Sequence, residues 1–145
     1  MAVYANNSKA LFDYEILERL TAGLELLGTE VKSVRAGKCN LRGTFIAVRG
    51  AEAYLVRADI PAYQPKNAPQ DYDALRTRKL LLSKSELENL KDAEGTKGLT
   101  IVPLSVYSKG RFLKLDIAIA RGKKIYDKRQ AIKKRDVERD LKRSL

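Results

Sequence analysis

The clearest pattern along the chain is a strict alternation of apolar and polar side chains near its carboxyl end. In residues 111–120, every second position from Leu113 to Ile119 is leucine or isoleucine. A period of two gathers these side chains on one face, so the segment predicts a β-strand with one buried face. Residues 99–108 are joined to it by a Lys-Gly turn, which predicts an antiparallel hairpin. Pro103 has no N–H to donate, so we expect a bulge or a sheet edge there.

A second alternating stretch lies near the amino end. Tyr14, Ile16, Leu24 and Leu26 are separated mostly by polar residues, which predicts one long strand bent near a central Ala-Gly pair. A helix competes for residues 15–20, because Glu, Leu and Arg are good helix formers. The alternation on both sides favours the strand.

A short helix is predicted directly after this strand, in the segment Gly28–Gly37. Thr29 is a candidate N-cap, and Gly37 suits the left-handed residue that ends many helices. Leu27, Val31 and Val34 fall on one face of such a helix, which we expect to pack on the core.

The middle of the chain predicts a second hairpin, a long loop and another short helix. Residues 44–48 and 53–60 flank a turn that contains glycine. Residues 61–75 hold three of the four prolines and predict a loop. Ser83 and Glu86 have the spacing of a capping box, which begins a helix that ends near Leu90.

Together these elements predict a mainly-β fold with a few short helices. Five or six short strands connected as antiparallel hairpins favour a small β-barrel. We expect residues 1–122 to form this single domain.

Charge is concentrated at the carboxyl end of the chain. Residues 121–145 contain eleven Lys or Arg and four acids, so they carry +7 of the net charge of +11. Apolar residues are too few there to form a core. We therefore expect residues 123–145 to be a basic tail that is disordered when free and binds a polyanion.

The tail also carries a weak helical pattern. Asp127 and Gln130 have capping-box spacing, and Val137, Leu141 and Leu145 form a thin apolar stripe. A helix of this length and composition is marginal alone, so we expect it to form only on a partner.

The amino-acid composition excludes several kinds of catalytic and metal site. With no histidine and one cysteine, Cys39, the chain cannot build a Ser-His-Asp triad, a Cys-His pair or a Cys/His zinc site. The GxxxxGK[ST] and GxGxxG motifs are absent. We expect a non-enzymatic protein with no catalytic residues, no metal and no cofactor. A single free thiol, no signal peptide and no apolar run of about 18 residues favour the cytoplasm and predict no membrane span.

The residues alone leave several functions open, because a basic polyanion binder could bind RNA or DNA. One alternative is a general single-strand RNA-binding or ribosome-assembly protein. Another is a small metal-dependent nuclease that uses acids such as Asp71 and Asp73. Binding of the tail to an anionic membrane is disfavoured, because its apolar stripe is narrow and lacks Trp.

Six motifs carry the interpretation further. They are Asn7–Ala10 with Tyr14, Gly28–Ser33, Arg35–Lys38, Arg76–Leu82, Val102–Leu104 with Tyr107, and Ala120–Lys124 with Asp127–Arg129. Their order and spacing resemble the small protein B family, the tmRNA-binding proteins of bacterial trans-translation. The resemblance runs from about Asn7 to Arg129, nearly the whole chain.

This resemblance implies an OB-like β-barrel that binds the tRNA-like domain of tmRNA and delivers it to stalled ribosomes. The tail would enter the empty mRNA channel near the decoding centre of the small subunit and become helical there. Elongation factor Tu would be a further partner in the delivery complex, and the protein would act as a monomer. The adaptor itself would catalyse no step.

The resemblance also assigns roles to residues. Those expected near the tmRNA are Asn7, Glu30, Lys32, Arg35, Lys38, Arg76, Arg78 and Lys79. Those expected in the ribosome-directed tail are Gly122, Lys123, Lys124, Tyr126, Asp127, Lys128 and Arg129. Leu81 is expected to act indirectly, through packing.

Two positions depart from the family pattern. Thr21 stands where an acid is usual, so a polar contact is lost or is rebuilt by a neighbour such as Glu25. Tyr126 stands where histidine or another aromatic is frequent, and it keeps the ability to stack on a base.

Overall fold

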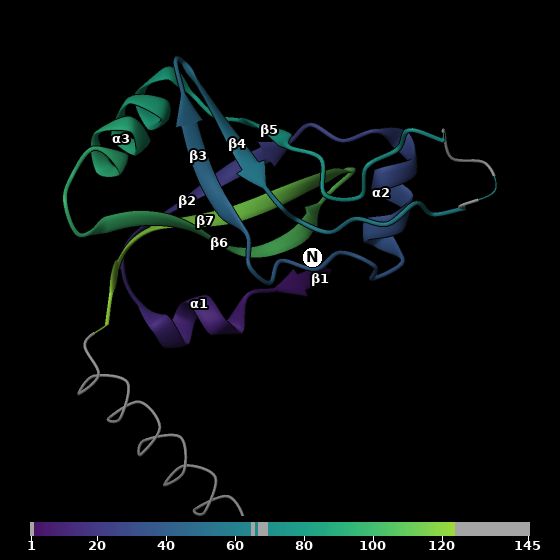
Figure 1. The fold of residues 1–145 in the computed structure, drawn as a ribbon, viewed down its shortest axis with the longest axis horizontal. Helices are drawn as coiled ribbons and strands as arrows, with labels where there is room; N and C mark the ends of the chain where they lie inside the picture. The colour runs from purple at the N-terminus through teal and green to yellow at the C-terminus, as the bar shows by residue number, and fades with distance from the viewer. Residues whose placement is uncertain (1, 65, 67–69, 124–145) are drawn as a thin grey trace, which may run out of the picture.

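The computed structural model describes residues 2–64, 66 and 70–123, which form a mainly-β domain with three short helices (Figure 1). The elements are β1 (Val3–Asn6), α1 (Ser8–Asp13), β2 (Tyr14–Leu24), α2 (Gly28–Arg35), β3 (Phe45–Arg49), β4 (Glu52–Val56), β5 (Arg78–Leu81), α3 (Lys84–Glu94), β6 (Leu99–Lys109) and β7 (Phe112–Gly122). The strands form one sheet in the order β1-β6-β7-β2-β5-β4-β3, and every pair is antiparallel. The predicted mainly-β, antiparallel fold class is confirmed.

The sheet curls but does not close into a complete barrel. Its hydrogen-bonded ladder ends at β1 on one side and at β3 on the other. β3 lies against β6 without joining the ladder. The predicted hairpin of residues 44–48 and 53–60 is β3 with β4, although β4 ends at Val56.

β2 is a strand throughout, which settles the competition with a helix over residues 15–20. It lies between β7 and β5, and both neighbours pair with its backbone. Over residues 15–20 the pairing is with β7 alone, since β5 pairs only with Gly23 and Leu24. This ladder outweighs a local helix preference that amounts to tenths of a kcal/mol per residue. The register shifts once, between Ile16 and Glu18.

The alternation that predicted β7 corresponds to two different packing faces. Leu115 and Ile117 are fully buried in the main core. The other face carries Ala118 and Ala120, which pack with Ala10 of α1 in a second, smaller cluster. Small side chains allow α1 to approach the sheet closely on that side.

The ends of α2 differ in part from the prediction. The N-cap is Leu27, not Thr29, and the Leu27 N–H donates to the Glu30 carboxylate at 2.8 Å. Leu27 is 50% exposed, so it does not belong to the packed face as predicted, whereas Val34 is fully buried. Gly37 has φ +79°, which confirms the predicted left-handed end.

Two further local predictions are confirmed. Ser83 and Glu86 form the capping box, with the Glu86 N–H donating to Ser83 Oγ at 3.2 Å and the Ser83 N–H donating to Glu86 Oε1 at 3.0 Å. The helix continues to Glu94 and buries Leu90. The register of β6 against β7 shifts directly after Pro103, as the missing N–H requires.

The domain reaches the point where the basic tail was predicted to begin. Gly122 is the last residue of β7 and pairs with Tyr14. The Lys123 N–H donates to the Asp13 carbonyl at 2.9 Å, and Lys123 Nζ donates to the Leu11 carbonyl at 3.2 Å. Gly122 and Lys123 are therefore held by the domain, and the predicted tail helix lies outside the described residues. No helix of the described part is long and apolar enough to cross a membrane.

Candidate nucleic-acid interface

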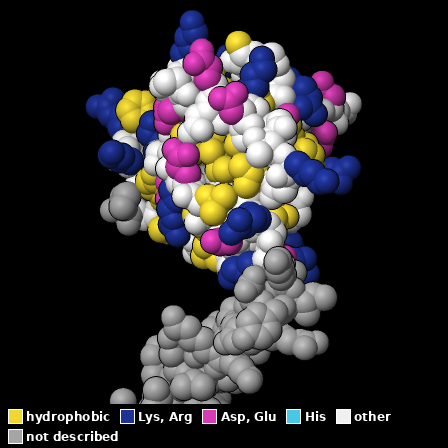
Figure 2. All heavy atoms as spheres, turned by 90° about the vertical axis from the view of Figure 1, so that its left-hand side faces the viewer, with side chains coloured by type: hydrophobic (Ala, Val, Ile, Leu, Met, Phe, Trp, Pro, Cys, Tyr) yellow, Lys and Arg dark blue, Asp and Glu magenta, His cyan; other side chains and the backbone are white. Residues whose placement is uncertain are grey.

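Charge is not uniform over the domain. Figure 2 shows the side of the molecule that lies at the left of Figure 1, and there acids and bases mix around an apolar centre. Where opposite charges alternate closely, each weakens the attraction of the other for a polyanion. The predicted RNA-binding residues of α2 lie elsewhere, at the right-hand side of Figure 1.

Three predicted cations come together around α2. Lys32 and Arg35 belong to the last turns of the helix, Lys38 follows its glycine end, and all three are exposed. The Arg35 guanidinium donates to the Arg111 carbonyl at 2.8 Å, which ties α2 to the turn between β6 and β7. Lys38 Nζ lies 5.6 Å from the ring centroid of Tyr63, within the range of a cation–π contact.

Two other predicted residues, Glu30 and Arg78, lie inside the domain. Both side chains are fully buried. Arg78 Nε donates to Glu30 Oε2 at 3.0 Å, and its Nη2 donates to the Ala74 carbonyl at 3.1 Å. Arg78 also donates to the Ala58 carbonyl. Because its side chain is fully buried, Arg78 offers no surface to a phosphate in this structure.

Arg76 completes this internal charge cluster from the surface side. Its Nε donates to Glu30 Oε2 at 2.9 Å, and its Nη2 pairs with the other carboxylate oxygen. Tyr72 adds a hydroxyl that donates to the Ile60 carbonyl at 2.6 Å and lies 3.2 Å from Glu30 Oε2. One carboxylate of α2 therefore anchors the segment that leads from the long loop into β5.

The cluster stabilises the charged form of Glu30. Burial alone would raise its pKa, but hydrogen bonds from Arg76, from the Leu27 N–H and from Arg78 outweigh burial and lower the pKa to about 2. The same surroundings raise the pKa of Tyr72, first through burial and then through the nearby Glu30 charge. Glu30 is therefore a fixed anion that orders its neighbours, not a group that titrates near neutral pH.

Asn7 and Lys79 complete the set of predicted residues. Asn7 Nδ2 donates to the Pro103 carbonyl at 2.9 Å, directly before α1, and Figure 1 places α1 away from α2. Lys79 Nζ pairs with Glu52 at 2.9 Å across β4 and β5. Lys32, Arg35 and Lys38 are exposed along the carboxyl-terminal end of α2. Asn7 lines a hollow with Asn40 and Arg42, which follow Lys38 closely in the chain.

Leu81 and Thr21 also differ from expectation. Leu81 is 52% exposed, so it is a surface residue, whereas the preceding Leu80 packs in the core. Thr21 Oγ1 donates to Asp116 Oδ1 at 3.2 Å, and the two residues are partners across β2 and β7. The carboxylate beside Thr21 is thus supplied by Asp116, not by Glu25.

Sequence reasoning missed the turn between β6 and β7 as part of this surface. Arg111 is exposed beside Arg35, and Phe112 next to it is 67% exposed. The available signal was an aromatic residue directly after a cation at a hairpin turn, where no core position is expected. Strand periodicity places Phe112 on the face of Lys114 and Asp116, opposite the buried Leu113 and Leu115.

The two acids considered for a nuclease, Asp71 and Asp73, lie in the long loop before β5. Asp73 Oδ1 accepts from the Leu75 N–H at 2.9 Å, and Asp71 is exposed. Among residues 2–64, 66 and 70–123, no three His, Cys, Asp or Glu side chains are grouped so as to hold a metal ion.

Comparisons with known proteins agree on one family. A family model described as SmpB protein matches residues 4–145. An SsrA-binding protein of Chloroflexus aggregans is 50% identical over 145 residues, which are 100% of this chain and 92% of that protein. An SsrA-binding protein of Mesoplasma florum is 50% identical over 137 residues, 94% of this chain and 92% of that protein. A solved structure described as "tmRNA-SmpB: a journey to the center of the bacterial ribosome" has a TM-score of 0.68 and 45% identity, over 83% of this chain and 84% of that one.

Proposed function

The chain belongs to the SmpB protein family, and from this premise we propose that it is a tmRNA-binding adaptor of trans-translation on the ribosome. SsrA is another name for tmRNA, so the names of the relatives and the subject of the similar structure point to the same RNA. The resemblance inferred from the sequence motifs is thereby confirmed. The adaptor works by binding and catalyses no step.

The observation that best supports an RNA-binding surface at α2 is the hydrogen bond from Arg35 to the Arg111 carbonyl. It fixes the cations of α2 beside those of the β6–β7 turn, so that charges from distant parts of the sequence form one surface. A folded RNA is bound mainly through its phosphates and its shape, which a rigid group of cations suits. Lys32, Arg35 and Lys38 contact the tRNA-like domain of tmRNA from here.

The buried charge cluster acts on RNA binding indirectly. Glu30, Arg76 and Arg78 position α2 against the loop before β5, and they influence RNA binding through that geometry. Asn7, which shares a hollow with Asn40 and Arg42, and Lys79, which pairs with Glu52, contribute at the margins of this surface.

The carboxyl-terminal residues belong to the proposal through the family resemblance alone. The tail beyond Lys123 reaches the mRNA channel near the decoding centre, where Lys124, Tyr126, Asp127, Lys128 and Arg129 act. Elongation factor Tu joins the delivery complex, the protein enters it as a cytoplasmic monomer, and residues 1–122 are the RNA-binding domain.

The test is the affinity of the full chain for the tRNA-like domain of tmRNA over a range of salt concentrations. Changing Lys32, Arg35 and Lys38 together to Ala should weaken binding strongly. Each lost phosphate contact should also flatten the slope of log affinity against log salt by about 0.7 to 0.9. The matched control changes three exposed lysines at or near α3, Lys84, Lys91 and Lys97, and should leave the slope nearly unchanged.

Two outcomes would count against the proposal. Equal effects of the two triple variants would mean that net charge matters and the α2 surface does not. Equal wild-type affinity for the tRNA-like domain and for an unstructured single-stranded RNA would favour a general RNA-binding protein instead.

A further inference from the structure

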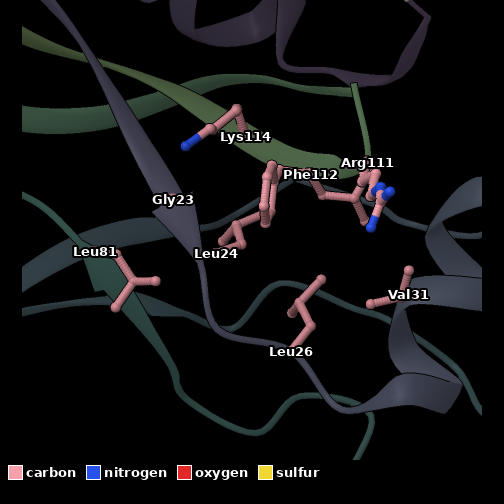
Figure 3. A pocket seen from close by; sticks show the side chains of 9 residues that line it. Gly23, Leu24, Leu26, Val31, Leu81, Arg111, Phe112 and Lys114 are labelled. Atoms are coloured by element: carbon pink, nitrogen blue, oxygen red, sulfur yellow. The ribbon is translucent and has the colours of Figure 1, made fainter. Parts of the chain in front are cut away.

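Phe112 is the most exposed of the large apolar side chains in the described residues, at 67%. It stands at the first position of β7, beside a small apolar hollow lined by Leu24, Leu26, Val31 and Leu81 (Figure 3). The figure shows the Phe112 and Leu24 side chains pointing toward one another, with Leu26 and Val31 farther along the hollow. An exposed ring over an apolar floor indicates a binding surface more than a solvated turn.

Gly23 also lines this hollow. Gly23 pairs with Leu81 of β5 on one side and with Lys114 of β7 on the other. A Cβ atom at position 23 would come within 3.1 Å of the Leu81 Cβ, closer than ordinary packing allows. A side chain at this position would therefore displace Leu81, which lines the hollow.

The size of the hollow limits what can enter it. Its volume is about 170 Å³, below the range of roughly 300–1,000 Å³ that is usual for sites enclosing a whole small molecule. A single flat group can lie against the ring with one edge in the hollow. A helix or strand of a protein partner would find too little apolar surface.

Cations flank the ring on both sides. Lys114 Nζ lies 5.8 Å from the Phe112 ring centroid, and Arg111 lies on the opposite side, held beside Arg35. The acids in this region are Glu25, which follows β2, and Asp116, which pairs with Thr21 farther along β7. A flat apolar surface between cations complements a nucleobase and the phosphates that adjoin it.

We propose that Phe112 stacks on an unpaired nucleobase of the bound RNA, while Arg111 and Lys114 neutralise the adjoining phosphates. This inference rests on the proposed function, because it names a contact within the same RNA-binding surface. Stacking is independent of sequence, since every base has a π-face. Phe112 therefore contributes affinity for an RNA whose loops present unpaired bases, and it adds little to affinity for a continuous duplex.

The experiment uses the full chain and a transcript of the tRNA-like domain of tmRNA, with 2-aminopurine replacing its unpaired adenines one at a time. Phe112→Ala and Phe112→Leu should weaken binding by about 5- to 150-fold, the range for loss of one base–aromatic stack. Phe112→Tyr keeps a ring and should bind within about twofold of wild type. The salt slope should not change in these variants, whereas Lys114→Ala should flatten it.

Fluorescence of 2-aminopurine distinguishes stacking from a purely structural role of Phe112, because only a stacked ring quenches it. One 2-aminopurine position should be quenched on binding to wild type and to Phe112→Tyr, but not to Phe112→Leu. Because Phe112 is largely exposed, all three variants should unfold at nearly the wild-type temperature.

Two results would overturn the inference and are distinct from failure of the proposed function. If wild type binds the transcript and Phe112→Leu binds equally well, the ring does not stack, while the adaptor function stands. If Phe112→Ala weakens attachment to a ribosomal protein but not to the transcript, the hollow serves a protein. If wild type itself does not bind the transcript, the proposed function and this inference both fail.

Discussion

At the scale of single residues, the arrangement of the RNA-binding surface depends most on Glu30. It lies on α2, fully buried, and accepts hydrogen bonds from Arg76, Arg78 and the Leu27 N–H. An ion pair buried in this way stabilises a particular geometry, because removing one member leaves the other charged and unpaired.

We predict that Glu30→Gln lowers the free energy of unfolding by about 3–5 kcal/mol, the usual cost of breaking a buried ion pair. Denaturant unfolding at pH 7 measures this change. Glu52→Gln, which removes an exposed partner of Lys79, is the matched control and should have little effect. A small loss for Glu30→Gln would mean that the cluster does not hold α2.

The stability difference between wild type and Glu30→Gln should depend on pH. The pKa of Glu30 is lowered from 4.5 to about 2 in the folded state, so the unfolded state takes up the proton first as the pH falls. The stability from this group is present above pH 4.5 and is lost as the pH falls toward 2. The difference in unfolding free energy between wild type and Glu30→Gln should therefore shrink across this window, and a constant difference would contradict the lowered pKa.

Sequence reasoning at this scale could select Glu30 and Arg78 but not place them. They are 48 residues apart in the chain, and a basic cluster such as Arg-Thr-Arg-Lys usually indicates an exposed surface. Only the packing of α2 against β5 shows that Arg78 is buried. Phe112 was not selected at all, because no sequence motif marks an exposed ring as a binding residue.

At the scale of elements, the end of α2 determines where Lys38 lies. Gly37 has φ +79°, a region that side chains with a Cβ disfavour, and nothing would touch a Cβ added there. Any cost of a substitution would therefore be conformational, with no steric part.

We predict that Gly37→Ala lowers stability by about 1–2 kcal/mol, the cost of left-handed backbone for an L-residue. It should also weaken tmRNA binding, because Lys38, which follows this glycine and contacts Tyr63, would be displaced. Gly28→Ala is the matched control: it lies at the start of the same helix, where an added Cβ would also meet nothing and the backbone needs no positive φ. It should be neutral or slightly stabilising. Equal stability of the two variants, measured by thermal unfolding, would show that the left-handed end is not required.

Helices and strands were predictable where their type and their ends depend on residues close in the sequence. The alternation along β7 and the Ser83–Glu86 capping box both depend on neighbours within a few residues. The N-cap of α2 was misplaced because Leu27 caps through Glu30, whose carboxylate is also the hub of the buried cluster. A local pattern shows the capping role of Glu30 but not its ion pairs with residues distant in the sequence.

At the scale of the whole molecule, the fold class followed from the sequence but closure of the sheet did not. Strand periodicity predicts antiparallel hairpins, whereas closure depends on whether β1 and β3 meet at the two ends of the ladder. The RNA surface likewise depends on distant contacts, since Arg35 and the Arg111 carbonyl are 76 residues apart. Patterns along the sequence do not encode such a contact.

The central claim is that the domain, through the surface of α2 and the β6–β7 turn, binds tmRNA, and that the tail serves a later step. The most direct measurement compares three proteins for affinity to the tRNA-like domain of tmRNA: the full chain, a chain ending at Lys123, and the full chain with Lys32, Arg35 and Lys38 changed to Ala. We predict that truncation changes affinity by no more than a few-fold and abolishes peptide tagging on stalled ribosomes, while the triple variant loses affinity by at least tenfold. Strong loss of affinity on truncation, with the triple variant binding like wild type, would contradict the account.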